Sequence, residues 1–548
     1  MKSQKTVWWM IVSIVCALVV GFAAGNFLSG RSFGRKLFLT PNNKINIIMD
    51  IINEDYVDTI NMKDLTEKAI YNLIDELDPH SVYISNDELQ DVIDDMDGHF
   101  GGVGIDYMRY KDTIVVVNVH YGSPASQAGM QAGDRIIQIN GQPFVGIEMS
   151  NETLLKKMRG KVGSNVKMTI YRTETDSIIE YSLQRNSILM TSVKAAYEVS
   201  KGIGYIKIFD KFTHTTYDEF IQAITKLTKQ GCTSFILDLR SNSGGSYDAA
   251  VQIINEFFPE GRLLVYTEGK SFPRIESVSD GSGSLADKPV VILIDQMSAS
   301  ASEIVAGSMQ DNDRGLIIGR RSFGKGLVQN QIELSDGSAV RLTIARYFTP
   351  SGRNIQRRYE LGKTSEYNQD WLDQLSNGES FHADSIKLDT ASTYQTVHGR
   401  TVYGNGGIMP DIFVPLDTTY LTSYYLQLEN KDMFNRFAFE YVDANRAFFR
   451  QFKDEQALTN YLKTQPILSE FIRYAELNGV KRRTVLIYRS SNQILRTALA
   501  SIVNKLFGEE AFFRVYQEND ADIARAIKAI NDGEAHPKAI AASPIKIR

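Results

Sequence analysis

This chain of 548 residues contains few cysteines and tryptophans and has no excess of positive charge. The two cysteines are Cys16 and Cys232, and Cys16 lies in an apolar N-terminal run, so no disulfide between them is expected. With 60 basic and 65 acidic residues, the net charge of -5 provides no field that attracts nucleic acid. The seven histidines are scattered and form no HExxH motif, so we expect no metal and no other cofactor. A GxSxG motif is also missing, which argues against an α/β-hydrolase with a histidine triad.

The N-terminus contains one uncharged run, from Val7 to Gly25, that approaches the roughly 20 residues of a membrane-spanning helix. Because Lys2 and Lys5 precede this run, we predict a cytoplasmic N-terminus at residues 1–6 and a signal-anchor helix at 7–26. The chain would then be a single-pass protein of the cytoplasmic (inner) membrane, with the residues that follow the anchor on the periplasmic side.

Two alternatives to an anchor differ in how the N-terminus is processed. A cleaved signal peptide usually has an apolar region of about 7–15 residues, which is shorter than this run. A lipoprotein anchor at Cys16 needs a small residue before the cysteine, and Val15 is not small. Both alternatives are therefore less favoured than a helix that stays in the membrane.

The rest of the chain is too long for one hydrophobic core, and its patterns change along its length. Apolar residues with helical spacing predict an N-terminal helical region at 37–97. Short strand-like runs separated by glycine-rich turns predict a β-rich domain at 98–186. Strands that alternate with helices predict an α/β core at 187–416. A helical pattern rich in aromatic residues predicts a C-terminal helical domain at 417–530, followed by a tail at 531–548.

The α/β core contains the clearest local signals. We predict strands from Ser234 to Arg240 and from Val290 to Ile294, because both runs are apolar and short. A helix is predicted to begin near Thr215 and to stop at Gly231, and another to begin at Ala301.

The segment Ser298 to Glu303 reads SASASE and joins a predicted strand to the helix from Ala301. A serine at such a turn presents its hydroxyl where the first amides of the helix are unpaired and can stabilise an oxyanion. The same letters also suit an ordinary helix start. The segment therefore holds a candidate nucleophile that needs a basic partner.

Lys325 lies in the segment FGKG, directly after the predicted strand GLIIG. A lysine can serve as a base near neutral pH only if burial lowers its pKa by roughly 3 units, and the flanking glycines would allow the close backbone approach that burial needs. Residues 319–326 also nearly match the sequence motif of a nucleotide-binding loop, but Gly326 stands where that motif requires Ser or Thr. Ser164 and Lys167 do not form a dyad, because residues three apart on a strand point to opposite faces.

Two further segments combine polar residues with a proline or paired glycines that interrupt the helix or strand pattern. Leu77 to Ser85 reads LDPHSVYIS. Its His80 could be a catalytic acid or base, but we prefer to interpret it as a loop histidine with a structural hydrogen bond. Asp238 to Ser246 reads DLRSNSGGS and ends a predicted strand with paired glycines. Such glycines allow a tight turn and expose N–H groups at the carboxyl end of a sheet.

The β-rich domain begins with GGVGI, from Gly101 to Ile105, where successive N–H groups can converge on a carboxylate. Together with SPASQAGMQAGDRIIQINGQ at 123–142, this run resembles a PDZ domain. The resemblance implies that the C-terminus of a peptide adds as a strand and that its carboxylate binds near Gly102, Val103, Gly104 and Ile105.

Five segments occur in the order found in the carboxyl-terminal processing (tail-specific) serine proteases, namely DLRSNSGG, SASASEIVAGSMQD, GRRSFGKGLVQ, LTIARYFTPSGRNIQ and GGIMPDI. The resemblance covers residues of about 40–415. It implies an α/β protease core with crotonase-like or Clp-protease-like β-α-β alternation, an inserted PDZ domain, an N-terminal helical segment and a C-terminal helical extension. It also implies a serine endopeptidase that recognises the C-terminal tails of exported proteins and uses no cofactor.

The same resemblance implies roles for single residues. Ser300, the middle serine of SASAS, would be the nucleophile, and Lys325 would be its general base. Gln329 would orient the lysine. The N–H groups of Ala301 and Gly244 would form the oxyanion hole.

The predicted partners are protein substrates bound through their tails, and the membrane through the N-terminal helix. The C-terminal helical domain is a candidate site for an adaptor or for self-association. A different class of function is a peptide-binding scaffold or chaperone with a silent protease fold. That function would be indicated by loss of Ser300 or Lys325, and both are present.

Overall fold

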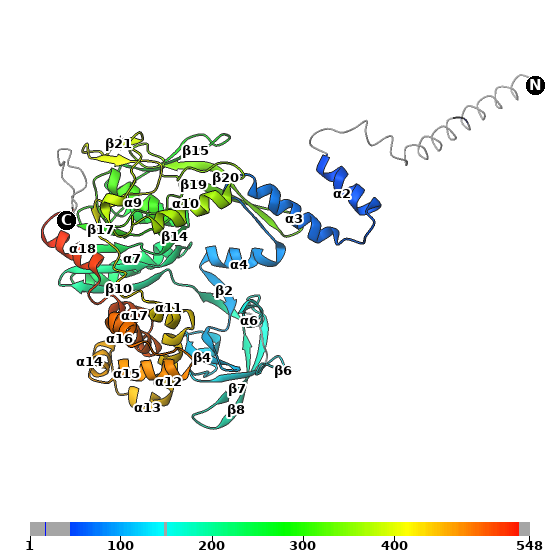
Figure 1. Ribbon diagram of the computed structural model, residues 1–548, viewed down its shortest axis with the longest axis vertical. Coiled ribbons are helices and arrows are strands. Elements are labelled where there is room, and N and C mark those ends of the chain that lie inside the picture. The colour runs from blue at the N-terminus through cyan, green and yellow to red at the C-terminus, as the bar shows by residue number, and fades with distance from the viewer. Residues whose placement is uncertain (1–16, 18–43, 147–150, 536–548) are drawn as a thin grey trace, which may run out of the picture. The chain divides into compact units, whose positions relative to one another are not determined.

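The computed structural model describes residues 17, 44–146 and 151–535, in one unit that ends at Ile74 and a second that starts at Asp75 (Figure 1). In the first unit, helices α2 (Lys44–Asp55) and α3 (Met62–Asp75) agree with the predicted helical spacing. All elements described below belong to the second unit. Residues 1–6 and most of the predicted tail lie outside the described residues.

The predicted single-pass location in the inner membrane is wrong. A helix needs about 20 mainly apolar residues to cross a bilayer, and no helix among the described residues is both long and apolar enough. The longest of them, α16 (Thr484–Phe507), carries Arg489 and Arg496. The predicted anchor at 7–26 lies outside the described residues except for Ala17. The membrane partner was inferred from that anchor, and we do not retain it.

A six-stranded sheet forms the centre of the second unit. Its strand order is β10-β11-β13-β17-β18-β23, and all neighbours are parallel except β10 and β11. The strands are β10 (Val193–Ser200), β11 (Ile203–Ile208), β13 (Ser234–Asp238), β17 (Val290–Ile294), β18 (Leu316–Gly319) and β23 (Ile412–Phe413).

Helices cover both faces of this sheet, because each strand sends alternate side chains to opposite sides. On one face, Phe235 and Leu237 join a hydrophobic cluster with helices from the adjoining sequence. These helices are α7 (Thr216–Lys229), α8 (Tyr247–Asn255) and α9 (Ala301–Asp311). On the other face, Ile236 joins a cluster with Ile523 and Ala526 of α18 (Ala521–Asn531). One layer of the core therefore comes from the far end of the chain.

A second, antiparallel sheet holds the strand that follows the FGKG segment. Its order is β1-β20-β15-β16, with β19 also paired to β20. The strands are β1 (Val82–Ile84), β15 (Leu263–Glu268), β16 (Ile275–Val278), β19 (Leu327–Glu333) and β20 (Ala339–Phe348). Strand β1 comes from the LDPHSVYIS segment, so this sheet brings that segment to the strand after Lys325.

The β-rich segment has its own sheet and its own hydrophobic cluster. Strands β2 (His99–Gly102) and β9 (Asn186–Leu189), at its two ends, pair antiparallel. The elements between them are β3 (Ile105–Tyr110), β4 (Thr113–Val119), α5 (Pro124–Gln127), β5 (Arg135–Ile139), β6 (Gln142–Pro143), α6 (Asn151–Met158), β7 (Asn165–Arg172) and β8 (Ser177–Gln184). The chain thus enters and leaves this segment at one place.

The C-terminal helices before α18 share another hydrophobic cluster, rich in aromatic side chains. Phe434 and Phe471, for example, are stacked with ring centroids 4.7 Å apart. The helices are α11 (Ser423–Asn430), α12 (Met433–Ala444), α13 (Arg446–Phe449), α14 (Glu455–Lys463), α15 (Ile467–Leu477), α16 and α17 (Glu509–Tyr516). The remaining elements are α4 (Asn86–Asp97), β12 (Asp210–Phe212), β14 (Asn242–Gly245), α10 (Thr364–Ser376), a 3₁₀ turn (Ala383–Ser385), β21 (Thr393–Gln395) and β22 (Thr401–Tyr403).

Candidate active site

Three loops that carry predicted site residues leave the same edge of the central sheet. Strands β13, β17 and β18 are parallel neighbours, and the loops after them lead to Gly244, Ser300 and Lys325, respectively. Because the carboxyl ends of parallel strands meet at one edge, this order brings the three loops together. Such an edge is the common place for a site in an α/β fold.

Ser300 is set apart from its two neighbouring serines. It lies directly before α9 with φ 53°, a left-handed conformation that is uncommon for a residue other than glycine. Ser298 and Ser302 are fully buried, and their hydroxyls donate to Leu239 O at 2.8 Å and to Asn242 Oδ1 at 2.8 Å. Ser300 is only partly buried, so its hydroxyl is the accessible one of the three.

The Lys325 amine is held by the glutamine that was predicted to orient it. Its Nζ donates to Gln329 Oε1 at 2.9 Å, and the Gln329 amide in turn donates to the His80 carbonyl. Burial lowers the pKa of Lys325, and the positive charge of Arg341 lowers it further. Among the described residues, the amine makes no hydrogen bond to Ser300.

The backbones of Ser300 and Lys325 are nevertheless held close together. Glu303 Oε2 accepts from the N–H of Ser300 at 2.9 Å and from the N–H of Lys325 at 2.8 Å. The Tyr347 hydroxyl lies 3.2 Å from Ser300 O and 2.7 Å from Lys325 O. Each backbone is thus within two hydrogen-bond lengths of the other.

Glu303 is a site residue that our reading of the sequence missed. Its other oxygen, Oε1, accepts from Ser322 Oγ at 2.5 Å and from the N–H of Gly324 at 2.7 Å. The carboxyl group is fully buried, and this burial raises its pKa to about 7, although the hydrogen bonds act in the opposite direction. In the sequence Glu303 is only the glutamate of an ordinary helix start, which gave no sign of these contacts.

The predicted oxyanion residues lie beside Ser300. Gly244 has φ 102°, and a Cβ on it would lie 2.5 Å from Ser300 Cβ, so only glycine fits there. Its N–H donates to Asn242 Oδ1 at 3.0 Å. The N–H of Ala301 opens helix α9 and has no acceptor within the described part of the chain. The N–H of Ala301 is thus available to an oxyanion, whereas the N–H of Gly244 is occupied by Asn242.

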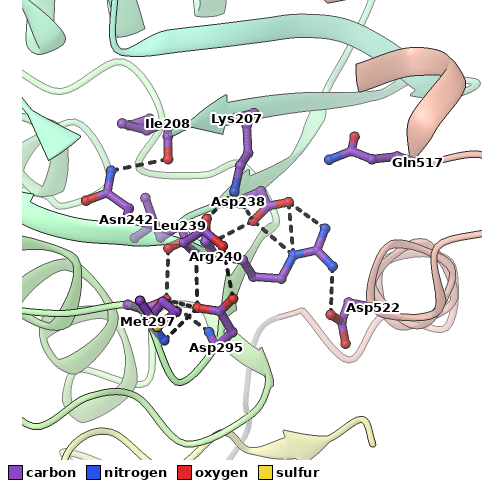
Figure 2. Close-up of polar contacts among 12 residues, drawn as sticks. Lys207, Ile208, Asp238, Leu239, Arg240, Asn242, Asp295, Met297, Gln517 and Asp522 are labelled. Carbon is purple, nitrogen blue, oxygen red and sulfur yellow. Dashed lines mark hydrogen bonds and ion pairs between the residues drawn. The ribbon is translucent and has the colours of Figure 1, made fainter. Parts of the chain in front are cut away.

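Asn242 and Asp295 form hydrogen bonds with the loops at this edge of the sheet (Figure 2). The Asn242 amide donates to Ile208 O at 3.2 Å, while its backbone carbonyl accepts from the N–H of Ala299 at 3.0 Å. Asp295 Oδ1 accepts from the N–H groups of Ser241 and Met297, both at 3.0 Å. The loop of Gly244 and the loop of Ser300 are therefore tied to each other.

His80 makes hydrogen bonds of the structural kind that we preferred from the sequence, and its backbone carbonyl accepts from the Gln329 amide. The ring nitrogen Nε2 of His80 lies 3.1 Å from the Tyr367 hydroxyl, and the backbone N–H of His80 donates to Asp78 Oδ1 at 3.0 Å. Burial lowers the pKa of His80 to about 4, and Lys325 contributes to the decrease. The imidazole is therefore neutral at physiological pH.

The four residues predicted to bind a peptide carboxylate lie in the β-rich segment and are all buried. Val103 and Ile105 belong to the hydrophobic cluster that includes Leu154 and Met158 of α6. The carbonyl of Gly104 accepts from the N–H of His120 at 3.0 Å. For a metal ion, the described residues offer no group of three or more His, Cys, Asp or Glu side chains.

Comparison with known proteins gives three matches to family models. Residues 202–365 match peptidase family S41, residues 115–172 match the PDZ domain, and residues 424–508 match a family of unknown function, DUF8443. The first two fall on the α/β core and on the β-rich segment.

Two curated relatives and one solved structure extend the comparison. The carboxy-terminal-processing protease of Bartonella bacilliformis is 37% identical over 352 residues, which are 62% of this chain and 80% of the relative. A probable CtpA-like serine protease of Staphylococcus haemolyticus is 35% identical over 314 residues, 57% of this chain and 62% of that protein. The structure of a photosystem II D1 C-terminal processing protease is 29% identical, with a TM-score of 0.33, and the match covers 57% of this chain and 83% of that one.

Proposed function

Because this chain belongs to the carboxy-terminal-processing protease family, within peptidase family S41, we propose that Ser300 and Lys325 act as its catalytic dyad. The predicted family and the predicted fold class are confirmed, including the PDZ domain. The chain is therefore a serine-type peptidase of this family. The roles of single residues, and the way the PDZ domain serves cleavage, are our proposals.

The observation that carries the dyad is the double anchoring of the two residues by Glu303. One carboxylate oxygen binds the N–H groups of Ser300 and Lys325, so their backbones cannot separate while Glu303 is in place. A positioned base with a lowered pKa can activate a serine hydroxyl that is weak at its ordinary pKa. In the proposed active state, the Lys325 amine leaves Gln329 Oε1 and hydrogen-bonds to the Ser300 hydroxyl.

In the proposed reaction, the neutral Lys325 amine takes the proton of the Ser300 hydroxyl while Oγ attacks a peptide carbonyl carbon. The carbonyl oxygen becomes an oxyanion, which the N–H groups of Ala301 and Gly244 stabilise. The Lys325 ammonium then gives its proton to the leaving amine. Water, deprotonated by the same amine, releases the acyl group from Ser300. For Gly244 to take part, its N–H has to leave Asn242 Oδ1 and turn to the oxyanion.

The PDZ domain would supply the substrate by binding its tail. Strand β3 is the edge strand of its sheet, so an extended peptide can pair with its outer edge. The terminal carboxylate would bind the N–H groups of Gly102, Val103, Gly104 and Ile105. Since these residues are buried, the surrounding segment has to rearrange to admit the tail. An adaptor or self-association site on the C-terminal helical domain stays a prediction.

The test compares Ser300→Ala with the unchanged enzyme on one peptide that ends in a free tail. We expect cleavage to fall at least about 10³-fold, because a serine protease without its nucleophile keeps only residual activity. Binding of the labelled tail, followed by fluorescence anisotropy, should stay the same. Cleavage at an unchanged rate would refute the dyad.

A matched peptide tests the tail-binding step on its own. Amidation of the terminal carboxylate removes the charge that the loop would bind, and hydrogen bonds to charged groups are worth about 1.5–3 kcal/mol. We expect the amidated peptide to bind Ser300→Ala at least about tenfold more weakly than the free acid. Equal binding of both peptides would place carboxylate recognition elsewhere. Cleavage that depends on Ser300 would still stand in that case.

A further inference from the structure

Asp522 connects the two arginines from which the proposed catalytic loops start. Arg240 Nη1 donates to Asp522 Oδ2 at 2.7 Å, and Arg320 Nη2 donates to the same oxygen at 3.1 Å. Arg240 follows β13 on the way to Gly244, and Arg320 follows β18 on the way to Lys325. A single carboxylate from the far end of the chain thus joins the starts of both loops.

These contacts are buried, which makes them sensitive to the loss of one partner. Asp522 is 4% exposed and Arg320 is 6% exposed. Arg240 also binds Asp238 and Asp520, and Figure 2 shows its guanidinium between Asp238 and Asp522. A buried guanidinium that loses its carboxylate is left without compensation for its charge.

Arg320 depends on Asp522 more than Arg240 does. Within the described residues, its guanidinium has one other acceptor, the carbonyl of Val414 at 3.2 Å. Without the Asp522 carboxylate, the Arg320 guanidinium would keep only the Val414 carbonyl, and the start of the Lys325 loop would lose its side-chain anchor. The Gly244 loop would retain the contacts of Arg240 with Asp238 and Asp520.

Helix α18 gives Asp522 a fixed position. The helix begins after Asp520, whose side chain accepts from the N–H of Ile523 at 3.0 Å. Ile523, Ala526 and Ala529 pack on the face of the central sheet that α7, α8 and α9 leave uncovered. The carboxylate is thus presented from a packed layer of the core and not from a free tail.

We propose that Asp522 is a positioning residue for the peptidase reaction, acting through Arg240 and Arg320 on the loops of Gly244 and Lys325. This inference rests on the proposed function, because it assigns meaning to the place of those loops. A catalytic group displaced by about 1 Å can cost about 10²-fold in rate. Substrate tails would bind at the PDZ domain, so loss of Asp522 should lower kcat and leave KM nearly unchanged.

The test uses the full chain and three substitutions in or directly after α18. Asp522→Asn keeps the shape and removes the charge, and we expect kcat to fall at least about tenfold with KM changed less than about twofold. Asp522→Glu restores a carboxylate and should recover part of kcat. Asp532→Asn is the matched control, because Asp532 lies directly after the same helix and forms an exposed pair with Lys528, and it should match the unchanged enzyme. A folded Asp522→Asn enzyme with unchanged kcat would overturn the proposal.

If Asp522→Asn does not fold, the combination with Arg320→Gln removes both buried charges together. A folded double variant with an unchanged kcat would show that Asp522 serves stability alone, which also overturns the proposal. A low kcat in this folded variant supports positioning. Ser300→Ala, measured in parallel, separates the failure of the proposed function from the failure of this inference. If Ser300→Ala cleaves normally, the proposed function fails. If Ser300→Ala is inactive while Asp522→Asn is fully active, only the role of Asp522 is refuted.

Discussion

The catalytic loops and the PDZ domain are held together by different interactions. At the catalytic loops, charged groups such as Glu303 and Asp522 are buried and bind partners far away in the sequence. In the PDZ domain, pairs such as His120 with Asp106 and Lys167 with Glu180 are largely exposed, and the hydrophobic cluster holds the fold together with one buried pair, Arg172 with Asp134. Exposed pairs contribute little and buried ones are costly to break. Substitutions at the buried carboxylates should therefore affect the catalytic loops strongly, whereas substitutions at the exposed pairs should affect the PDZ domain weakly.

Replacement of Lys325 should produce the largest effect. Lys325→Met removes the proposed base, and we expect kcat/KM for a tail peptide to fall by about 10³-fold or more. Lys325→Arg keeps the positive charge but cannot give up a proton at accessible pH, so it should be equally inactive. If Lys325→Arg retained activity within tenfold of the unchanged enzyme, charge and not basicity would be the contribution of this residue.

Glu303→Gln should come next, because it changes the anchor of both loops. An amide NH₂ would replace one carboxylate oxygen and face donors that need an acceptor. We expect a loss of roughly 2–4 kcal/mol in the free energy of unfolding and a decrease of about 10²-fold in kcat. Urea unfolding and steady-state kinetics measure the two effects. A variant that loses neither would remove the main support for the anchored dyad.

The same substitution should change how stability depends on pH. Burial raises the pKa of Glu303 to about 7 in the folded protein, whereas an unfolded glutamate titrates near 4.3. The folded state then holds its proton more tightly, so this group stabilises the fold at low pH. That stability is lost as pH rises through about 7, by roughly 3 kcal/mol. Unfolding at pH 5 and at pH 8 should show this slope in the unchanged protein and not in Glu303→Gln.

His120→Gln should have the smallest effect, since it breaks an exposed pair of the PDZ domain. The hydrogen bond to Asp106 at 2.9 Å raises the pKa of His120. A raised histidine pKa contributes stability below about pH 6.5 that disappears as pH rises through the raised value. We expect less than about 1 kcal/mol at pH 5.5, nothing at pH 8.5, and unchanged kcat. A loss above 2 kcal/mol would erase the contrast between the two regions.

The core elements could be predicted because their signals are local. The strand at Val290–Ile294 and the start of a helix at Ala301 appear as expected, and α7 ends two residues before Gly231. An apolar run, a helix-start pattern and a glycine stop each depend on a few neighbouring residues. Parallel alternation then places the loops of Gly244, Ser300 and Lys325 at one edge.

The contacts that position the site could not be predicted in the same way. Tyr347 resembles any residue of a strand, and Asp522 any acidic residue in the first turn of a helix. Their partners become apparent only when distant segments are folded together. The contact of Lys325 with Gln329 was implied by the family resemblance, but whether the amine also reaches Ser300 depends on a side-chain rotamer, which a sequence pattern does not encode.

The most direct test of the account asks which serine of SASAS forms the acyl-enzyme. Acid quenching during turnover of a slow peptide ester, followed by peptide mass spectrometry, would locate the acyl group. We expect it on Ser300 alone, because the hydroxyls of Ser298 and Ser302 are buried and donate to the backbone or to Asn242. An acyl group on another residue, in an enzyme that cleaves at its normal rate, would contradict the central claim.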